Sequence, residues 1–392
     1  MRIIWPPILL TGVLILFPSI NQGGKLFDKA GKKQLTIYLQ DICRWTLDVK
    51  LSKWPGTKKG VAGMENAVVQ GNLARSLIAA GELTKDGSTY IAEALLWADA
   101  FTSQQQRVRT SRGGEAGFWT DADGNIEILE NCMAAGALGR ISEAADGNRK
   151  KGCQQAMERL ARFLLEGCNA DPTSKRPAIV GWVNSEGAQK GAWGNGIIKG
   201  TQSLQPSTRS TVAAAFFFAE LFGQSRNKQY RDIAMDAVTW LMKSRRPNGE
   251  FPEVIDGKEA EEISYVSVAY CTDAILSVFY LLDDSGFNQH LPADLENTAR
   301  QLMRVQGEKG IWGEGLDRYG STGVATLLAW YYSNPASKPD ESIPQSLDKF
   351  WQLLSNPVHA QSFGLFANGV PTGFLGLTTA EMIKPGITYK KL

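Results

Sequence analysis

The chain has 392 residues, of which 43% are hydrophobic and 21% are charged. These fractions are typical of a soluble globular protein, and the length suffices for one large domain or two ordinary ones. The formal net charge is only +2. Such a chain has no strong field for attracting nucleic acid or an anionic membrane, so we expect no nucleic-acid partner.

The N-terminal segment has the pattern of a secretory signal. A positively charged start is followed by an apolar stretch at residues 3–17, which two prolines interrupt, and by a polar exit at 18–24. The stretch is short for a membrane span. We predict a signal peptide at 1–22, a single folded domain at 25–392, and a secreted or periplasmic location. Because no small-x-small pair marks a cleavage site, the alternative is an uncleaved anchor, and only then would the protein contact a membrane.

Two stretches of the chain repeat each other at a distance of 65 residues. Five residues of one stretch, Glu65, Asn66, Gly71, Leu73 and Arg75, recur as Glu130, Asn131, Gly136, Leu138 and Arg140. Looser copies of the surrounding unit follow to the end of the chain. A repeat of this length predicts an array of similar supersecondary units.

Apolar residues spaced three and four apart mark twelve helical stretches of two alternating kinds. A helix with one polar face belongs on the outside of a bundle, and a helix that is apolar all round belongs inside. The strict alternation therefore predicts six outer–inner hairpins closed into an all-α (α/α)6 toroid. The expected outer helices cover residues 34–49, 88–104, 151–166, 228–245, 292–306 and 344–355. The expected inner helices cover residues 65–81, 128–144, 207–222, 262–282, 320–333 and 371–383.

The connections from outer to inner helices are long, and the longest runs from about residue 166 to 206. These loops would all lie on one rim, above the N-terminal ends of the inner helices. Since long loops inside compact domains are usually functional, we expect the site on this rim.

The long loops share a glycine followed by an aromatic residue, as in Gly117-Phe118-Trp119, Gly191-Ala192-Trp193, Gly249-Glu250-Phe251 and Gly310-Ile311-Trp312. This repeat resembles the glycine–aromatic motif of α/α toroids, including terpenoid cyclases, prenyltransferases and many carbohydrate-active enzymes. The resemblance implies the architecture and no particular reaction. A terpenoid cyclase is disfavoured because the only aspartate pair, Asp283-Asp284, lies at the C-terminal end of an inner helix, where it would cap the next turn.

The loop at residues 113–131 carries side-chain oxygens at alternate positions, namely at Asp121, Asp123, Asn125 and Glu127. Calcium loops space their ligands in this way. An EF-hand, however, would place a glycine one position later, and Asp123-Gly124 suits a tight turn between two strands. We therefore predict a hairpin, with no metal and no cofactor, and keep Ca²⁺ as the alternative.

A second resemblance concerns the first repeat. The stretches at residues 69–76, 83–86 and 90–94, with Trp119 and the helix that follows it, look like the helical domain of uronyl C5-epimerases. They are also similar to helical-toroid polysaccharide lyases and glycosidases. The resemblance implies a carbohydrate-active enzyme with a carbohydrate as its partner. The catalytic tyrosines of the epimerase family have no match here, so no catalytic residue is transferred.

Lyases and epimerases of this kind remove the proton alpha to a uronate carboxylate, which requires a cation for the carboxylate and a base. Arg209 and Arg318 are the candidate cations, because the helix dipole opposes a cation at a helix N-terminus and another reason must place them there. Tyr265 or Tyr319 is the candidate base or acid, activated if an arginine lowers its pKa. Glu130 completes the catalytic candidates. The predicted substrate-binding residues are Glu65, Asn66, Asn131, Trp119, Trp182, Trp193, Asn195, Trp312 and Glu314.

Two other classes of function remain open. A glycoside hydrolase would need two carboxylates, which Glu65, Glu130, Glu253 and Glu314 could supply. A noncatalytic toroid that binds a glycan needs neither a base nor an acid. Basic residues of the loops could attract an anionic chain in either case, namely Arg107, Arg109, Arg112, Lys190 and Lys199.

Overall fold

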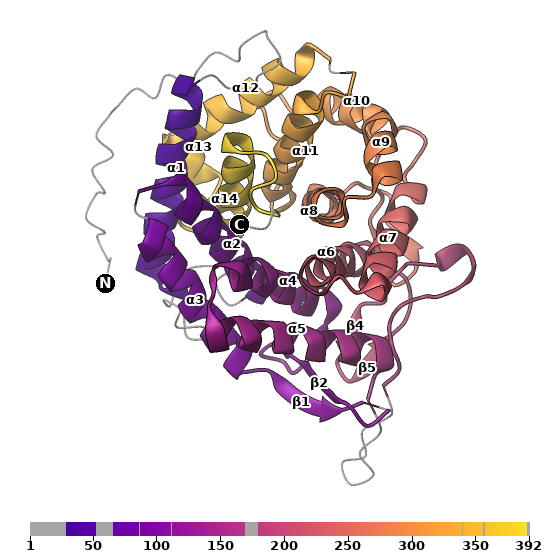
Figure 1. Ribbon diagram of the computed structural model, residues 1–392. Helices are drawn as coiled ribbons and strands as arrows, with labels where there is room; N and C mark the ends of the chain where they lie inside the picture. The colour runs from indigo at the N-terminus through magenta and orange to yellow at the C-terminus, as the bar shows by residue number, and fades with distance from the viewer. Residues whose placement is uncertain are drawn as a thin grey trace, which may run out of the picture.

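The computed structural model describes residues 29–51, 66–85, 87–110, 112–168, 179–338, 340–355 and 357–389. Six inner helices form a ring, each packed against the next, and the last packs against the first (Figure 1). The predicted (α/α)6 toroid is confirmed. The proposed signal segment lies outside the described residues. The inner helices are α2 (Ala67–Leu83), α4 (Ile128–Ala144), α6 (Thr208–Ser225), α8 (Tyr265–Leu282), α11 (Ser321–Ser333) and α14 (Gly369–Ile383).

Outer helices surround this ring (Figure 1). They are α1 (Lys29–Val49), α3 (Gly87–Ser103), α5 (Gly147–Glu166), α7 (Lys228–Lys243), α9 (Ser285–Asp294), α10 (Glu296–Arg304), α12 (Ser342–Ser355) and α13 (Pro357–Ser362). The prediction of one outer helix at 292–306 is wrong, since two helices meet at Leu295. The first begins earlier because the Asp284 carboxylate caps it by accepting from the Phe287 backbone N–H, as expected for the aspartate pair.

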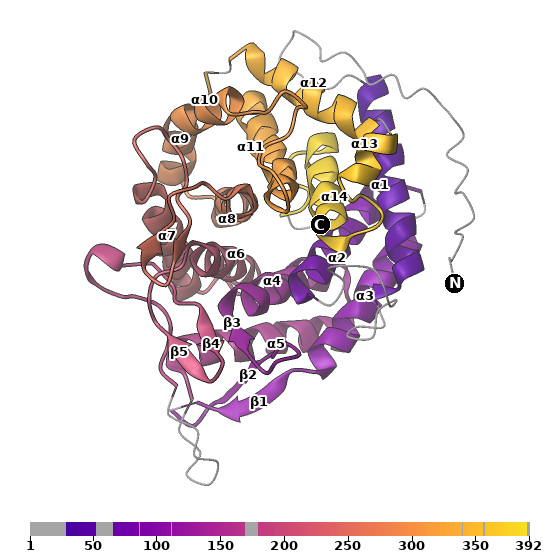
Figure 2. The same cartoon turned by 180° about the vertical axis from the view of Figure 1, so that it is seen from behind.

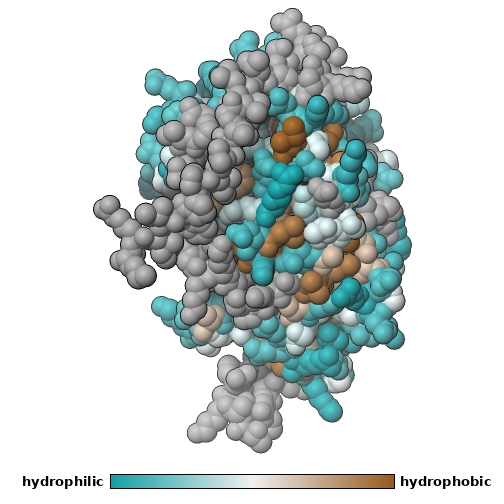
Figure 3. Space-filling view, turned by 90° about the vertical axis from the view of Figure 1, so that its left-hand side faces the viewer, coloured by the Kyte–Doolittle hydropathy of each residue, from teal (hydrophilic) through white to brown (hydrophobic). Residues whose placement is uncertain are grey.

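The inner helices are buried on nearly all sides. The repeated glycines allow this close packing, since a Cβ atom at Gly136 would lie 2.3 Å from the Phe216 ring. Among the described residues, only α8 is long and apolar enough to span a bilayer, and 78% of its apolar window is buried in the ring. The outer face that carries α1 and α3 is mostly hydrophilic with separate small apolar areas (Figure 3), as a water-facing helix requires.

The strands of the described chain all lie in connections from an outer to an inner helix. Figure 2 shows β3, β4 and β5 beside α4 and α6. This agrees with the predicted grouping of the long loops above the inner helix N-termini. The short elements are β1 (Gln106–Arg109), β2 (Glu115–Phe118), β3 (Ile126–Glu127), β4 (Gly196–Ile198), β5 (Thr201–Ser203), β6 (Val254–Ile255), β7 (Lys258–Glu259) and the 3-10 turns η2 (Gly187–Gln189) and η3 (Asp317–Gly320).

The hairpin predicted around Asp123-Gly124 is wrong in its strand pairing. The turn exists, because the Asp121 carboxylate accepts from the backbone N–H groups of Asp123 and Asn125. The flanking strands nevertheless pair elsewhere, β2 with β1 and β3 with β4. A turn motif fixes only its own residues, whereas the long loop before α6 supplies the partner of β3.

The C-terminal segment returns into the ring after α14 (Figure 1). The Glu381 carboxylate accepts from the backbone N–H groups of Gly386 and Thr388. The Arg140 guanidinium, in the last part of α4, donates to the carbonyl oxygen of Ile387. The segment 384–389 therefore packs at the C-terminal ends of the inner helices, opposite the loop rim.

Candidate functional site

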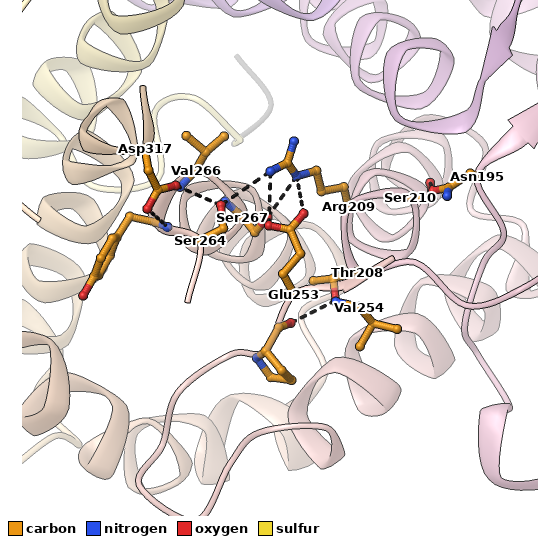
Figure 4. Close-up of polar contacts among 12 residues, drawn as sticks. Asn195, Thr208, Arg209, Ser210, Glu253, Val254, Ser264, Val266, Ser267 and Asp317 are labelled. Atoms are coloured by element: carbon orange, nitrogen blue, oxygen red, sulfur yellow. Dashed lines mark hydrogen bonds and ion pairs between the residues drawn. The ribbon is translucent and has the colours of Figure 1, made fainter. Parts of the chain in front are cut away.

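Arg209 lies in the first turn of α6 and is fixed along one edge of its guanidinium. Nε contacts Glu253 Oε1 at 2.7 Å and donates to Ser267 Oγ at 3.0 Å, while Nη2 donates to Glu253 Oε2 at 3.1 Å. The Glu253 side chain is 6% exposed and that of Arg209 is 39% exposed. Within the described residues Nη1 has no hydrogen-bond partner. The outer edge of the guanidinium is therefore available, and Figure 4 shows it directed into the space that the inner helices enclose.

Asp317, from η3, fixes the polar residues opposite Arg209 (Figure 4). Its carboxylate accepts from the backbone N–H groups of Tyr265 at 2.8 Å and Val266 at 3.0 Å, which begin α8. It also accepts from Ser264 Oγ at 2.9 Å, and Ser264 Oγ lies 3.5 Å from Arg209 Nη2. One carboxylate thus caps an inner helix and orients a hydroxyl toward the arginine.

Glu130 lies in the first turn of α4 and is half-buried. Its Oε1 accepts from Nδ2 of Asn66, which also caps α2. Burial first, and then the neighbouring carboxylates of Glu127 and Asp121, raise the pKa of Glu130 to about 7. This carboxyl group therefore exchanges a proton near neutral pH, as a general acid or base requires.

Tyr270, on α8, was not predicted from the sequence. It is 9% exposed and packs edge-on against Phe374. Burial raises the pKa of its hydroxyl to about 12, while the Arg209 charge acts to lower it and the Glu130 charge to raise it. The hydroxyl therefore lies within electrostatic range of both groups. The three residues lie in the first two turns of three consecutive inner helices, α4, α6 and α8.

The two predicted tyrosines lie at the start of α8 and in η3. Burial, followed by the carboxylates of Glu250 and Asp317, raises the pKa of Tyr265, so the expected activation by an arginine is wrong. Tyr319 is only 7% exposed, and its ring packs edge-on against Phe363.

The second predicted cation, Arg318, makes one hydrogen bond and one contact with an aromatic ring. Arg318 Nη2 donates to the carbonyl oxygen of Ser362, and its guanidinium lies 5.4 Å from the centre of the Tyr319 ring. In the described part of the chain, no hydrogen bond or ion pair connects the Arg318 side chain to Arg209 or Glu253.

The predicted aromatic platforms are core residues, which corrects that interpretation. Trp182, Trp193 and Trp312 are at most 1% exposed, and Trp119 is 5% exposed. Trp119 stacks on Phe101 with ring centres 4.2 Å apart. A sugar ring needs an open aromatic face, and these four have none. The glycine–aromatic repeat therefore packs the loops onto the helices.

Two predicted polar residues hold the loops in place. Asn131 Oδ1 accepts from the Trp119 backbone N–H, and Asn131 Nδ2 donates to the Trp119 carbonyl. Asn195 Nδ2 donates to Asp256, and its Oδ1 accepts from Ser210 (Figure 4).

Two further predicted carboxylates remain. Glu314 is exposed in the loop before η3. Glu65 lies outside the described residues.

In the loop with alternating oxygens, Asp121 binds other residues of the same loop. Asp121 Oδ1 accepts two backbone N–H groups, and Oδ2 accepts from Asn125 Nδ2. Among the described residues no cluster of three or more His, Cys, Asp and Glu is placed to hold a metal. The side-chain oxygens of Asp121 thus serve the turn.

A family described as pectic acid lyase matches residues 184–320, a range that contains Arg209, Glu253 and Tyr270 and ends before α11. The match covers about a third of the chain. No curated protein matches the sequence.

Solved structures match most of the chain at low identity. An inactive variant of an α-1,6-mannanase from Salegentibacter sp. HEL1_6, in complex with α-1,6-mannotriose, shares 14% identity over 89% of this chain and 99% of that one, with a TM-score of 0.54. An unsaturated glucuronyl hydrolase specific for heparin shares 12% over 90% and 97%, with a TM-score of 0.59. A sugar epimerase from a ruminal bacterium shares 12% over 83% and 86%, with a TM-score of 0.60.

These comparisons establish the fold that the helix ring displays. At such identities a structural match does not transfer a reaction. The chain is an (α/α)6 toroid with the architecture of these carbohydrate-active enzymes.

Proposed function

We propose that this protein is an enzyme that removes the proton alpha to the carboxylate of a uronate residue in an acidic polysaccharide, as a lyase or C5-epimerase. The observation that carries the proposal is the open edge of Arg209, held by Glu253 on the loop rim. The neighbouring inner helix α4 carries Glu130, whose pKa is about 7, in its first turn. A guanidinium binds a carboxylate through two parallel hydrogen bonds and stabilises the charge that develops on it. The partial match to a pectic acid lyase family over this arginine supports the same class.

The proposed step uses three groups. Arg209 neutralises the uronate carboxylate, and ionised Glu130 accepts the C5 proton. Tyr270, which its high pKa keeps protonated, donates a proton. In a lyase that proton goes to the departing glycosidic oxygen, so the C4–O bond breaks and a C4–C5 double bond forms. In an epimerase the proton returns to C5 from the opposite face.

A glycoside hydrolase is the second candidate. One observation favours it: Glu130 with its raised pKa stands near the carboxylates of Glu127 and Asp121, and a hydrolase uses one protonated and one ionised carboxyl group. Among the similar structures, the mannanase supports this class.

The test is an assay of the purified protein on polygalacturonate, alginate and a neutral α-mannan. A lyase forms an unsaturated uronate that absorbs in the ultraviolet, an epimerase incorporates solvent deuterium at C5, and a hydrolase forms reducing ends without that absorbance. If the protein acts on neither of the two acidic polymers, the uronate proposal is contradicted. New reducing ends from mannan would favour the hydrolase.

Variants locate the activity. Glu130→Gln should lower kcat by roughly 10²–10⁴-fold, because the base is lost while the contact to Asn66 remains. The wild-type rate should rise with pH through about 7, where Glu130 ionises. Glu186→Gln, an exposed change in the loop before α6, serves as the control. An unchanged rate in Glu130→Gln would exclude this residue as the base.

We also propose that the protein is exported through residues 1–22, on the pattern of that segment. Mass spectrometry of the protein from the extracellular or periplasmic fraction tests this. Recovery of the intact chain only from the cytoplasm would contradict it.

A further inference from the structure

A groove of about 730 Å³ lies along the outer helix α5 and reaches the last turn of α6, the opposite end of that helix from Arg209. Its floor and walls come from α5, from the last turn of α6 and from the β1–β2 sheet. Figure 1 shows α5 beside β1 and β2 in this part of the molecule. The volume is within the range of sites that hold a ligand of a few hundred daltons.

The charged residues of this groove leave positive charge uncompensated. Four cations line it, and two carboxylates accompany them: Arg107, Lys151, Arg159 and Arg162, with Glu115 and Glu158. Counted at neutral pH, the four positive and two negative charges leave an excess of two.

The carboxylates are already shared. Arg107 Nη1 and Arg159 Nη1 both lie 3.6 Å from the same oxygen, Oε1 of Glu115. Glu158 accepts from the hydroxyl of Tyr230, on α7. Within the described residues, Arg162 Nη1 donates to the backbone carbonyl of Glu115 and to no side chain. One carboxylate cannot neutralise two guanidinium groups, so an anion at this point would find unused donors.

The pKa of Arg159 reflects burial and repulsion among these arginines. Its side chain is 12% exposed, and its Nε donates to Gln105 Oε1 at 2.6 Å. Burial and then the Arg107 charge lower its pKa. A bound anion would relieve this repulsion.

The rest of the lining identifies the kind of ligand. It consists of three glutamines, one serine and a single leucine, with no aromatic residue. Amide and hydroxyl groups bind sugar hydroxyls, whereas a lipid or an aromatic ligand would need apolar walls. We propose that this groove is a second binding site, for an acidic oligosaccharide whose carboxylate or sulfate group contacts Arg107, Arg159 and Arg162. The inference goes beyond the proposed function, because binding here involves no reaction at the ring.

The test measures binding by calorimetry in an Arg209→Gln background, which removes the open guanidinium of the ring. The probes are trigalacturonate, a trisaccharide with a sulfated sugar, neutral mannotriose and inorganic sulfate. Arg107→Gln/Arg162→Gln should weaken binding of the acidic trisaccharides roughly tenfold or more, since two charge-assisted contacts are lost. Both side chains are exposed, so the fold should tolerate the change. Arg149→Gln, an exposed change on the same helix, is the matched control.

Each outcome of these binding measurements either supports or overturns the proposed second site. The site is supported if the double variant binds the acidic trisaccharides more weakly, Arg149→Gln binds them as its parent does, and mannotriose does not bind. A preference for the carboxylated or the sulfated trisaccharide identifies the acidic group that the site binds. Equal affinity in the double variant and its parent overturns it. Mannotriose that binds as well as trigalacturonate, or sulfate that binds as tightly as either acidic trisaccharide, overturns the acidic-oligosaccharide assignment. Failure of the proposed reaction leaves these results unaffected, since none of them measures turnover.

Discussion

Glu130 links the candidate chemistry to folding stability. Its pKa is raised from 4.5 to about 7, so the folded state holds this proton more tightly than the unfolded chain. The corresponding stabilisation is complete below pH 4.5 and is lost as pH rises through 7. The glutamine in Glu130→Gln never ionises. The free energy of unfolding of this variant should therefore exceed that of the wild type by on the order of 2 kcal/mol at pH 8, but not at pH 4.

Urea denaturation of both proteins at the two pH values measures this difference. Glu186→Gln, whose side chain is exposed, should show no dependence of this kind. A gain in stability that is equal at both pH values would mean that desolvation of the carboxylate is not its cause.

Arg209 and Glu253 allow structure and function to be separated at one pair. Arg209→Gln leaves the Glu253 carboxylate, 6% exposed, without its partner, and we expect a loss of about 2–4 kcal/mol in unfolding free energy. Arg209→Gln/Glu253→Gln removes both charges and should recover most of that loss. Activity on acidic polysaccharide should stay low in both variants, because the guanidinium is absent.

Urea denaturation and a rate assay on the same preparations test the pair. Recovered stability with recovered activity would show that Arg209 acts only through folding. Loss of stability in the double variant equal to that in the single would show that the ion pair is not what holds this part of the rim.

At the scale of elements, Asp317 connects two hairpins of the ring. Asp317→Ala removes the acceptor of two N–H groups at the start of α8 and should cost about 1–2 kcal/mol. Asp317→Asn retains one oxygen and should lose less. Hydrogen exchange should accelerate at the amides of Tyr265 and Val266 first, since their acceptor is gone.

An exposed aspartate on an outer helix gives the control, and Asp232→Ala should leave exchange at α8 unchanged. If exchange in Asp317→Ala rises uniformly over the whole chain, the effect is global destabilisation and not the loss of a local cap.

The inner helices were predictable because their signal is local. The spacing of apolar residues placed one at 128–144, the bounds of α4, and another at 262–282, three residues longer than α8. The candidate site was not predictable in the same way. Tyr270 differs from an ordinary core residue through the charges around it, among them Arg209 and Glu130, which come from other helices of the ring. Likewise, nothing in the sequence around the loop tryptophans distinguishes a ring with an open face from a ring packed in the core.

At the scale of the molecule, the two ends of the ring differ. The loop rim carries Arg209 and Glu130, and the other end is closed by the chain itself. Below the rim, Arg75 pairs with Asp273 through two hydrogen bonds of 2.7 and 2.9 Å, and the Tyr389 hydroxyl donates to the same carboxylate. Arg75 is fully buried, so this layer is structural. We therefore propose that a substrate enters from the loop side.

The C-terminal segment should contribute strongly to stability for the same reason. A chain that ends at residue 384 loses the N–H donors of Glu381, the Tyr389 hydroxyl that donates to Asp273 and the Ile387 carbonyl that accepts from Arg140. A lost hydrogen bond to a buried charged group costs about 1–3 kcal/mol, and we expect a loss of several kcal/mol in unfolding free energy. A chain that ends at 389 keeps every one of these contacts and is the matched control.

Urea denaturation compares the two truncated chains, and Tyr389→Phe in the full chain isolates one contact. That variant should lose about 1–2 kcal/mol, because the hydroxyl alone is removed from a buried carboxylate. If the chain ending at 384 unfolds at the same urea concentration as the chain ending at 389, the segment does not close the ring. The space that the inner helices enclose would then be open at both ends, and a substrate could enter from either side.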